Sequence, residues 1–238
     1  MPEILTFPNP DETRDAVAAF LHEGVNAFLE YVPEVHIAMT GGSDGAQTSL
    51  SFLKLLTEQP VNGRVHLWWS DERFVEYTDE LRNDRQVADL IEEFRLGSLV
   101  ECHRAPSPSD GDIETSALRW EKEVSQIDFA FAVVGVGPDG HIASLFPGQW
   151  QPDESRAVFA VTDSPKPPSA RLTFSFNTIA DAQNIAVVAT GESKAPAISA
   201  AISGSNDLPI TALANLEQCS LWLDDDAARS LPLSTETE

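Results

Sequence analysis

A continuous apolar run, 129–134, is made of phenylalanine, alanine and valine and is followed by glycine. The run is too short for a typical helix, and its apolar residues do not alternate with polar ones as in a half-exposed strand. It therefore predicts a parallel strand that is buried on both faces. Parallel strands need long crossover connections, usually helices, so the chain is expected to be an α/β protein.

Predicted strands alternate with predicted helices along the rest of the chain. Short apolar runs predict further strands at 35–39, 65–69, 157–161, 171–176, 185–189 and 220–223. Three- and four-residue spacing of apolar side chains predicts helices at 11–32, around 50–56 after a glycine loop, and at 83–94, 112–125 and 193–202. This order implies right-handed crossovers and a doubly wound, mostly parallel, Rossmann-like sheet flanked by helices. We expect one domain, 1–224, and an acidic polar tail, 225–238.

The charge balance restricts the ligands. The chain has 38 acidic and 15 basic residues and a formal net charge of −23. Such a field repels nucleic acids and anionic membranes, so neither is expected as a partner. An anionic small substrate would need a local cationic pocket, which makes each basic residue informative. The lysines are Lys54, Lys122, Lys166 and Lys194.

Cysteine use and hydropathy indicate the setting. Cys102 and Cys219 match no metal-ligand spacing and are expected to be buried thiols, and no metal site is predicted. The N-terminal residues lack the basic and apolar regions of a secretion signal, and the longest apolar stretch is far shorter than the roughly 20 residues that cross a bilayer. We expect a cytoplasmic protein that is a monomer or a weak homodimer.

Polar segments next to predicted strands are the first candidates for a site, because open α/β sheets bind ligands beyond the carboxyl ends of their strands. Four stand out: 40–45, 70–73, 135–148 and 190–194. The glycines of 135–140 match the GxGxxG pattern of dinucleotide-binding loops. However, the residues after them reach Pro147 within one or two turns, and no strand ends in an acidic residue at the required distance. A tight turn is the simpler interpretation.

Five segments occur in the same order as the motifs of a known family. The string GVGPDGHIASLFPG, 135–148, resembles the signature of 6-phosphogluconolactonases. Other motifs of that family are similar to TGGS at 40–43, WSDER at 69–73 with Asn83 downstream, SPKPP at 164–168 with RLT at 171–173, and GESK at 191–194. One departure is Asp44, which stands beside the expected phosphate loop where the family usually has threonine or proline.

The resemblance implies both a fold and an activity. The fold is the α/β type shared with the related glucosamine-6-phosphate isomerase/deaminases. The activity is hydrolysis of 6-phospho-D-glucono-1,5-lactone to 6-phospho-D-gluconate, the lactonase step of the oxidative pentose phosphate pathway. The expected partner is thus a small sugar-phosphate lactone, and neither an organic cofactor nor a metal is expected.

Ester hydrolysis at neutral pH needs a base that is partly unprotonated near pH 7, and histidine meets this requirement. Only His141 follows a strand end inside a glycine-rich turn, where its ring can face a cleft. Asp139, two residues earlier, either orients that ring, positions water or simply forms the turn. The other histidines lie in a helix or strand, where a structural role is expected, or on an unassigned polar segment: His22, His36, His66 and His103.

Basic and polar residues supply the remaining expected roles. Arg73 either stabilises the negative charge on the former carbonyl oxygen or binds sugar hydroxyls, with a salt bridge to Asp71 or Glu72 as the structural alternative. Arg171, Lys194 and the backbone N–H groups of 41–43 are expected to hold the phosphate. Lys166, between prolines, either contacts substrate or stiffens a surface loop. The predicted substrate-binding set is Gly41, Gly42, Ser43, Asp71, Lys166, Arg171 and Lys194.

Two other functions stay open. A sugar-phosphate isomerase/deaminase shares the GxGxDGHIA string but continues into Phe-Asn-Glu-Pro, whereas this chain has Phe146 in place of that acid. A non-catalytic sugar-phosphate-binding regulator would not need a base such as His141. Turnover measured together with binding distinguishes the three.

Overall fold

The computed structural model describes residues 2–151, 154–204 and 208–231. Its strands are β1 (Glu3–Phe7), β2 (Glu34–Met39), β3 (Arg64–Trp69), β4 (Asp71–Arg73), β5 (Val100–Cys102), β6 (Phe129–Gly135), β7 (Val158–Val161), β8 (Arg171–Phe174), β9 (Asn184–Ala189) and β10 (Cys219–Asp224). Its α-helices are α1 (Pro10–Leu29), α2 (Gly42–Glu58), α3 (Asn83–Glu93), α4 (Ile113–Val124), α5 (Phe176–Ala180), α6 (Ala195–Ile202), α7 (Pro209–Ala214) and α8 (Asp225–Ala228).

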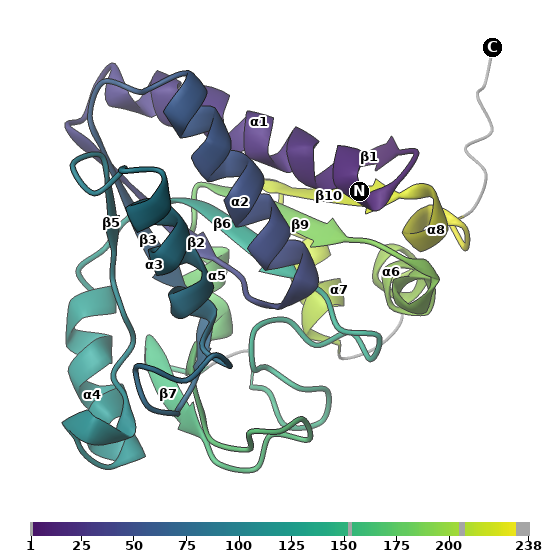
Figure 1. Ribbon diagram of the computed structural model, residues 1–238. Helices are drawn as coiled ribbons and strands as arrows, with labels where there is room; N and C mark the ends of the chain where they lie inside the picture. The colour runs from purple at the N-terminus through teal and green to yellow at the C-terminus, as the bar shows by residue number, and fades with distance from the viewer. Residues whose placement is uncertain (1, 152–153, 205–207, 232–238) are drawn as a thin grey trace.

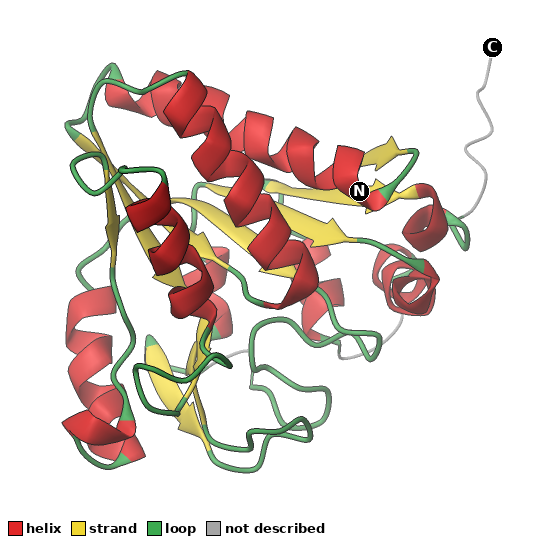
Figure 2. Cartoon of the chain, viewed as in Figure 1, coloured by secondary structure: helices red, strands yellow, loops and turns green. Residues whose placement is uncertain are grey.

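Two sheets organise these elements (Figure 2). The larger sheet has seven strands in the order β1-β10-β9-β6-β2-β3-β5, and every neighbouring pair in it is parallel. A separate antiparallel sheet has the order β4-β8-β7. The predicted α/β fold with a mostly parallel sheet is therefore confirmed.

Helices cover both faces of the large sheet because successive strand residues point to opposite sides. In β6, Phe131 and Val133 belong to the apolar core that includes α1, α2 and α3, whereas Ala132 and Val134 belong to a second core with α4, α6, α7 and the small sheet. Figure 1 shows α1 and α2 lying across the first of these faces. The sheet is thus doubly wound, as the sequence predicts.

The order of strands reverses between β2 and β6. From β2 the chain continues outward to β3 and β5, and from β6 it continues in the other direction to β9 and β10. The connections that leave the carboxyl ends of β2 and β6 therefore diverge, and ligands of open α/β sheets bind in the crevice at such a point.

The predicted strands 157–161 and 171–176 exist as β7 and β8, but they lie outside the large sheet. Only Ser70 lies between the end of β3 and the start of β4. β4 pairs with β8, and Arg73 lies opposite Arg171. An apolar run indicates that a segment is buried but not which strand it pairs with. The prediction of one sheet is therefore wrong for these two strands.

Other differences concern short or glycine-rich segments. α2 begins at Gly42, so most of the predicted glycine loop 40–45 is the first turn of that helix. The predicted tail 225–238 begins with α8, and its residues 232–238 lie outside the described part of the chain. In that described part, no helix is long and apolar enough to span a membrane. Both cysteines are free; Cys219 is buried and Cys102 half-buried.

Candidate active site

A cleft of about 220 Å³ opens at the carboxyl ends of β2 and β6, and all four predicted strand-end segments contribute to it. Asn83 and Asp44 line it as well. Nine of the ten residues of the predicted site line the cleft: Gly41, Gly42, Ser43, Asp71, Arg73, His141, Lys166, Arg171 and Lys194. The tenth, Asp139, is hydrogen-bonded to His141.

A tight turn after β6 places His141. The Gly137 N–H donates to the His141 carbonyl oxygen at 2.9 Å, and the Gly140 N–H donates to the Gly137 carbonyl oxygen at 3.0 Å. A Cβ atom on residue 137 would lie 1.9 Å from the His141 ring, so only glycine fits there. Turns and isolated bridges, rather than a helix, occupy residues 141–150. A dinucleotide-binding loop, which opens a helix, does not fit this segment.

The His141 ring is fixed in one tautomer. Its Nδ1 is hydrogen-bonded to Oδ1 of Asp139, and its Nε2 lies 3.3 Å from Nζ of Lys166. Because an ionised carboxylate only accepts hydrogen bonds, Nδ1 carries the proton and Nε2 presents a lone pair. Burial against groups such as the Phe146 ring, whose centroid is 4.9 Å away, lowers the pKa of His141. The Lys166 charge lowers that pKa further, while Asp139 acts to raise it.

Asp139 stays ionised beside this ring. Burial acts to raise the pKa of Asp139, but the hydrogen bond and charge of His141 outweigh it, so the pKa lies below its ordinary value. The pair therefore consists of a neutral imidazole and a carboxylate near pH 7. Such a pair can accept a proton at Nε2 and stabilise the resulting imidazolium.

The other end of the cleft is suited to an anion. Gly41 is the N-cap of α2, and Gly42 has a φ of +75°, a left-handed conformation that favours glycine. N–H groups in the first turn of a helix lack partners within the helix and attract anions. Lys194, at the end of the short 3₁₀ helix η2 (Glu192–Lys194), lines the same space, and burial lowers its pKa.

Arg171 is more enclosed than the sequence indicates. It donates to Oδ2 of Asp71 at 3.4 Å and to the carbonyl oxygens of Pro168 and Lys166, both at 3.2 Å. Asp71 also accepts from the Ser144 hydroxyl at 2.6 Å. Three of the five N–H groups of Arg171 are thus engaged, and the residue holds the segment that carries Lys166 beside His141.

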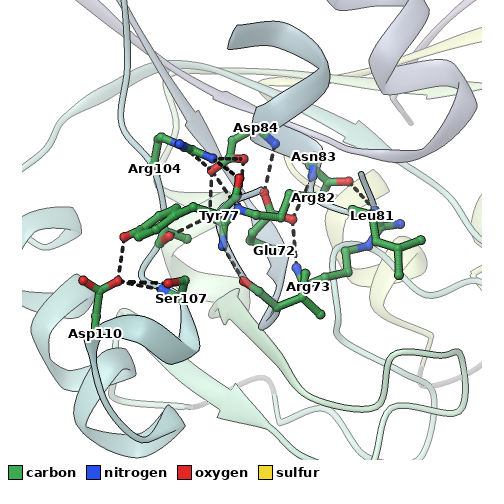
Figure 3. A network of polar contacts seen from close by, with 12 residues as sticks. Glu72, Arg73, Tyr77, Leu81, Arg82, Asn83, Asp84, Arg104, Ser107 and Asp110 are labelled. Atoms are coloured by element: carbon green, nitrogen blue, oxygen red, sulfur yellow. Dashed lines mark hydrogen bonds and ion pairs between the residues drawn. The ribbon is translucent and has the colours of Figure 1, made fainter. Parts of the chain in front are cut away.

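Arg73 is anchored from the side of the cleft. Its Nη1 donates to Oδ1 of Asn83 at 2.8 Å and to the carbonyl oxygen of Leu81 (Figure 3). The ion pairs found among the described residues do not include one between Arg73 and Asp71 or Glu72. Arg73 lines the cleft with one guanidinium nitrogen, Nη1, already fixed.

Glu72, the neighbour of Arg73, is a buried cap for α3. Its carboxylate accepts from the backbone N–H groups of Arg73, Asn83 and Asp84 at 2.8, 2.8 and 2.9 Å. Burial raises the pKa of Glu72 to about 7. These bonds fix the start of α3, and hence Asn83, against the arginine that it orients.

A further charged network lies behind this cap and does not reach the cleft. Asp84 and Arg82 are fully buried and pair at 2.6 Å, and Arg104 joins Asp84 at 3.0 Å. Both guanidinium groups lie over the Tyr77 ring, within 4.9 Å of its centroid (Figure 3). The network supports α3 and the segment before it. Helical periodicity alone places Arg82 and Asp84 at a helix start but does not show that they are buried.

Three histidines gather elsewhere, towards the amino ends of β2 and β3. Ring nitrogens of His36, His66 and His103 lie within 4.8 Å of one another. Burial lowers the pKa of His103 to about 4 and also lowers the pKa of His36. His36 Nδ1 accepts from the Trp68 indole at 3.0 Å, and His66 Nδ1 and His103 Nε2 share a hydrogen bond at 2.8 Å. The spacing in the sequence does not reveal this cluster, which arises from strand pairing.

The fold and the cleft together define a class of protein. A base oriented by a carboxylate, opposite a helix N-terminus and a lysine at the switch point of a doubly wound sheet, is typical of an α/β enzyme that acts on a phosphorylated small molecule. Residues 8–222 match the model of the family described as glucosamine-6-phosphate isomerases/6-phosphogluconolactonase. The chain belongs to that family, as its motifs predict.

Individual relatives agree with this assignment. The chain is 34% identical over 240 residues to the 6-phosphogluconolactonase of Mycobacterium tuberculosis, covering 95% of this chain and 97% of the relative. The solved 6-phosphogluconolactonase of Trypanosoma brucei aligns with a TM-score of 0.81 at 24% identity, covering 98% of this chain and 99% of the other. A monomeric glucosamine-6-phosphate deaminase aligns with a TM-score of 0.79 at 18% identity, covering 96% and 99%. The two structural matches show the shared fold.

Proposed function

We propose that the protein is a 6-phosphogluconolactonase that hydrolyses 6-phospho-D-glucono-1,5-lactone to 6-phospho-D-gluconate in the oxidative pentose phosphate pathway. The observation that carries this proposal is the pairing of Asp139 and His141 in one cleft with Lys194 and the first turn of α2. A base for water and a site for an anion suit a substrate that carries both a lactone and a phosphate. The curated relative described above bears the same enzyme name.

In the proposed reaction, a water molecule lies between Nε2 of His141 and the lactone carbonyl carbon. Nε2 takes a proton from the water as its oxygen bonds to that carbon, and the carbonyl electrons move to the carbonyl oxygen. Collapse of the tetrahedral intermediate breaks the bond to the ring oxygen, which receives the proton back from Nε2. The products are a carboxylic acid, which ionises, and a free hydroxyl group. Asp139 stabilises the imidazolium between the two proton transfers.

Two cations are proposed to stabilise charge at the reacting carbon. Lys166 Nζ lies 3.3 Å from Nε2. When the attacking water binds Nε2 in place of Lys166, the ammonium is proposed to stay nearby and to contact the former carbonyl oxygen. Arg73 approaches from β4, with Asn83 holding one of its nitrogens, and is proposed to bind the same oxygen or the sugar hydroxyls. Fixed positive groups aimed at a developing oxyanion lower the barrier.

The phosphate is proposed to lie against Lys194 and the backbone N–H groups of 41–43. Three N–H groups of Arg171 donate to Asp71, Lys166 and Pro168. The remaining N–H groups of Arg171 are proposed to bind the phosphate. Neither a metal nor an organic cofactor takes part in the proposed reaction. A cytoplasmic location and a monomeric or weakly dimeric state stay predictions from the sequence.

The isomerase/deaminase alternative has less support. Phe146, which stands where that pattern has glutamate, is buried and packs against the His141 ring. The acidic side chains that line the cleft are Asp44 and Asp71, and both already bind arginine. A carboxylate free to act as a second acid or base is therefore lacking among the residues lining the cleft.

A paired measurement of turnover and binding tests the proposal. His141→Ala should lower kcat by about 10²–10⁴-fold, the usual contribution of a positioned base. Calorimetric binding of 6-phosphogluconate should change by no more than about threefold, because the phosphate site is intact. His22→Ala removes another buried histidine outside the cleft and should retain turnover. Near-normal turnover by the His141 variant would exclude it as the base.

A further inference from the structure

Asp44 is an acidic residue in a place that should repel the proposed substrate. It belongs to the first turn of α2, lines the cleft beside Ser43 and Lys194, and its side chain is only 10% exposed. An unpaired carboxylate there would be costly to bury and would oppose a phosphate dianion. The structure shows how this charge is compensated.

Three groups donate to the Asp44 carboxylate. Arg14, from α1, donates to Oδ1 through Nη2 at 2.7 Å and through Nε at 3.0 Å. The Thr190 hydroxyl donates to the same oxygen at 2.7 Å, and the Thr190 N–H donates to Oδ2 at 3.3 Å. Arg14 is itself largely buried, with 15% of its side chain exposed. The ion pair is thus enclosed, and two N–H groups of Arg14 share one oxygen of Asp44 in charge-assisted hydrogen bonds.

These contacts join the two segments that form the anion-binding end. Asp44 carries the first turn of α2, and Thr190 lies between β9 and the 3₁₀ helix that ends at Lys194. The N–H of the next residue, Gly191, donates to both carboxylate oxygens of Asp224 at 2.9 and 3.0 Å. Asp44 therefore links the first turn of α2 to the segment that leads to Lys194.

We propose that Arg14 and Asp44 act as a positioning pair that gives the site its preference for a phosphorylated substrate, an inference that rests on the proposed function. Asp44 holds the α2 N-terminus and the Lys194 segment at a fixed spacing. Arg14 cancels the negative charge that this tie would otherwise present to the phosphate. Arg14 thus determines substrate preference through Asp44.

The pair makes an asymmetric prediction. Arg14→Ala leaves the Asp44 charge uncompensated, so KM for the phosphorylated lactone should rise by about tenfold or more, while KM for the unphosphorylated lactone should change little. Asp44→Asn removes the charge and should raise KM for the phosphorylated lactone by no more than about threefold. The double variant should recover most of the loss caused by Arg14→Ala, because the Asp44 charge is then absent.

Arg64→Ala is the matched control. Arg64 pairs with Glu101 at the protein surface, so this variant changes the net charge equally but away from the cleft, and it should leave both KM values unchanged. Calorimetric binding of 6-phosphogluconate and of gluconate by the same variants provides a readout without turnover. If the parent hydrolysed no lactone, the proposed function would fail, yet these binding data would still test the pair.

The outcomes separate charge masking from a merely structural role. Recovery of phosphate-selective binding in the double variant supports the proposal. A double variant no better than Arg14→Ala, or equal losses on both lactones, overturns it. If Arg14→Ala does not fold, Asp44→Asn decides. A rise of about tenfold in its KM for the phosphorylated lactone contradicts charge masking, and a KM that rises by no more than about threefold, or falls, supports it.

Discussion

Lys166 offers a direct test of the electrostatics around the proposed base. Its ammonium lies 3.3 Å from Nε2 of His141 and lowers the pKa of that ring. Lys166→Met removes the charge while keeping an aliphatic side chain of similar length. The pKa of His141 should therefore rise, and because only neutral His141 accepts a proton, the acid limb of the kcat/KM profile should move to higher pH.

The size of this shift follows from the geometry. Two unit charges 3.3 Å apart interact by about 5 kcal/mol at an effective dielectric of about 20, which is an upper bound. Lys166 is exposed, and exposed pairs are typically worth only about 0.2–1 kcal/mol after screening. At about 1.4 kcal/mol per pH unit, the expected shift is roughly half a unit, and less at high salt.

The assay is a set of kcat/KM profiles from about pH 5 to 8 at constant ionic strength, with spontaneous lactone hydrolysis subtracted. Lys122→Met, on the last turn of α4, removes an exposed lysine elsewhere and should not move the limb. Asp139→Asn removes a charge that raises the pKa of His141, so it should move the limb the other way. A Lys166→Met limb that moves to lower pH, or moves equally with Lys122→Met, would refute this account of the base.

Two further predictions concern the anion site and the support of Arg73. Lys194→Ala should lower kcat/KM for the phosphorylated lactone by about 10- to 150-fold, because one charge-assisted hydrogen bond is lost. It should change kcat/KM for the unphosphorylated lactone little. Equal losses on both substrates would show that Lys194 serves the reacting centre. Glu72→Gln should lower the free energy of unfolding by about 1–3 kcal/mol at pH 8, because an amide donor then meets backbone N–H groups. That difference, measured by denaturant titration, should grow as the pH falls from about 7 towards 4.5, because the folded parent then binds a proton at Glu72 that the unfolded chain does not. A difference that shrinks over this range would contradict the raised pKa.

The sequence predicts elements whose apolar residues are continuous or periodic. The helix expected at 112–125 is α4 (Ile113–Val124), and the run 129–134 is β6 with one more residue. β4 and β5 have three residues each, too few for either period to appear. Because β4 gives no signal, the sequence also cannot show that β8 pairs with it rather than with the large sheet.

The candidate site is predictable where its residues lie in loops that follow strands. Such loops meet at one edge of a parallel sheet, which is why separated motifs bring His141, Arg73 and Lys194 into one cleft. The compensation of Asp44 by Arg14 is not predictable in this way, because the two residues are 30 positions apart and Arg14 lies within a helix. The histidine cluster around His66 is not predictable either, because cross-strand neighbours depend on the register of strand pairing.

Lactonase activity is best tested by a coupled assay of the purified protein with freshly prepared 6-phosphogluconolactone. Formation of 6-phosphogluconate is followed and spontaneous hydrolysis is subtracted, with ammonia release from glucosamine-6-phosphate measured in parallel. We expect lactone hydrolysis well above the spontaneous rate, its loss in His141→Ala, and no ammonia. Lactone hydrolysis at only the spontaneous rate, or ammonia release at a rate comparable to lactone turnover, would contradict the proposed function.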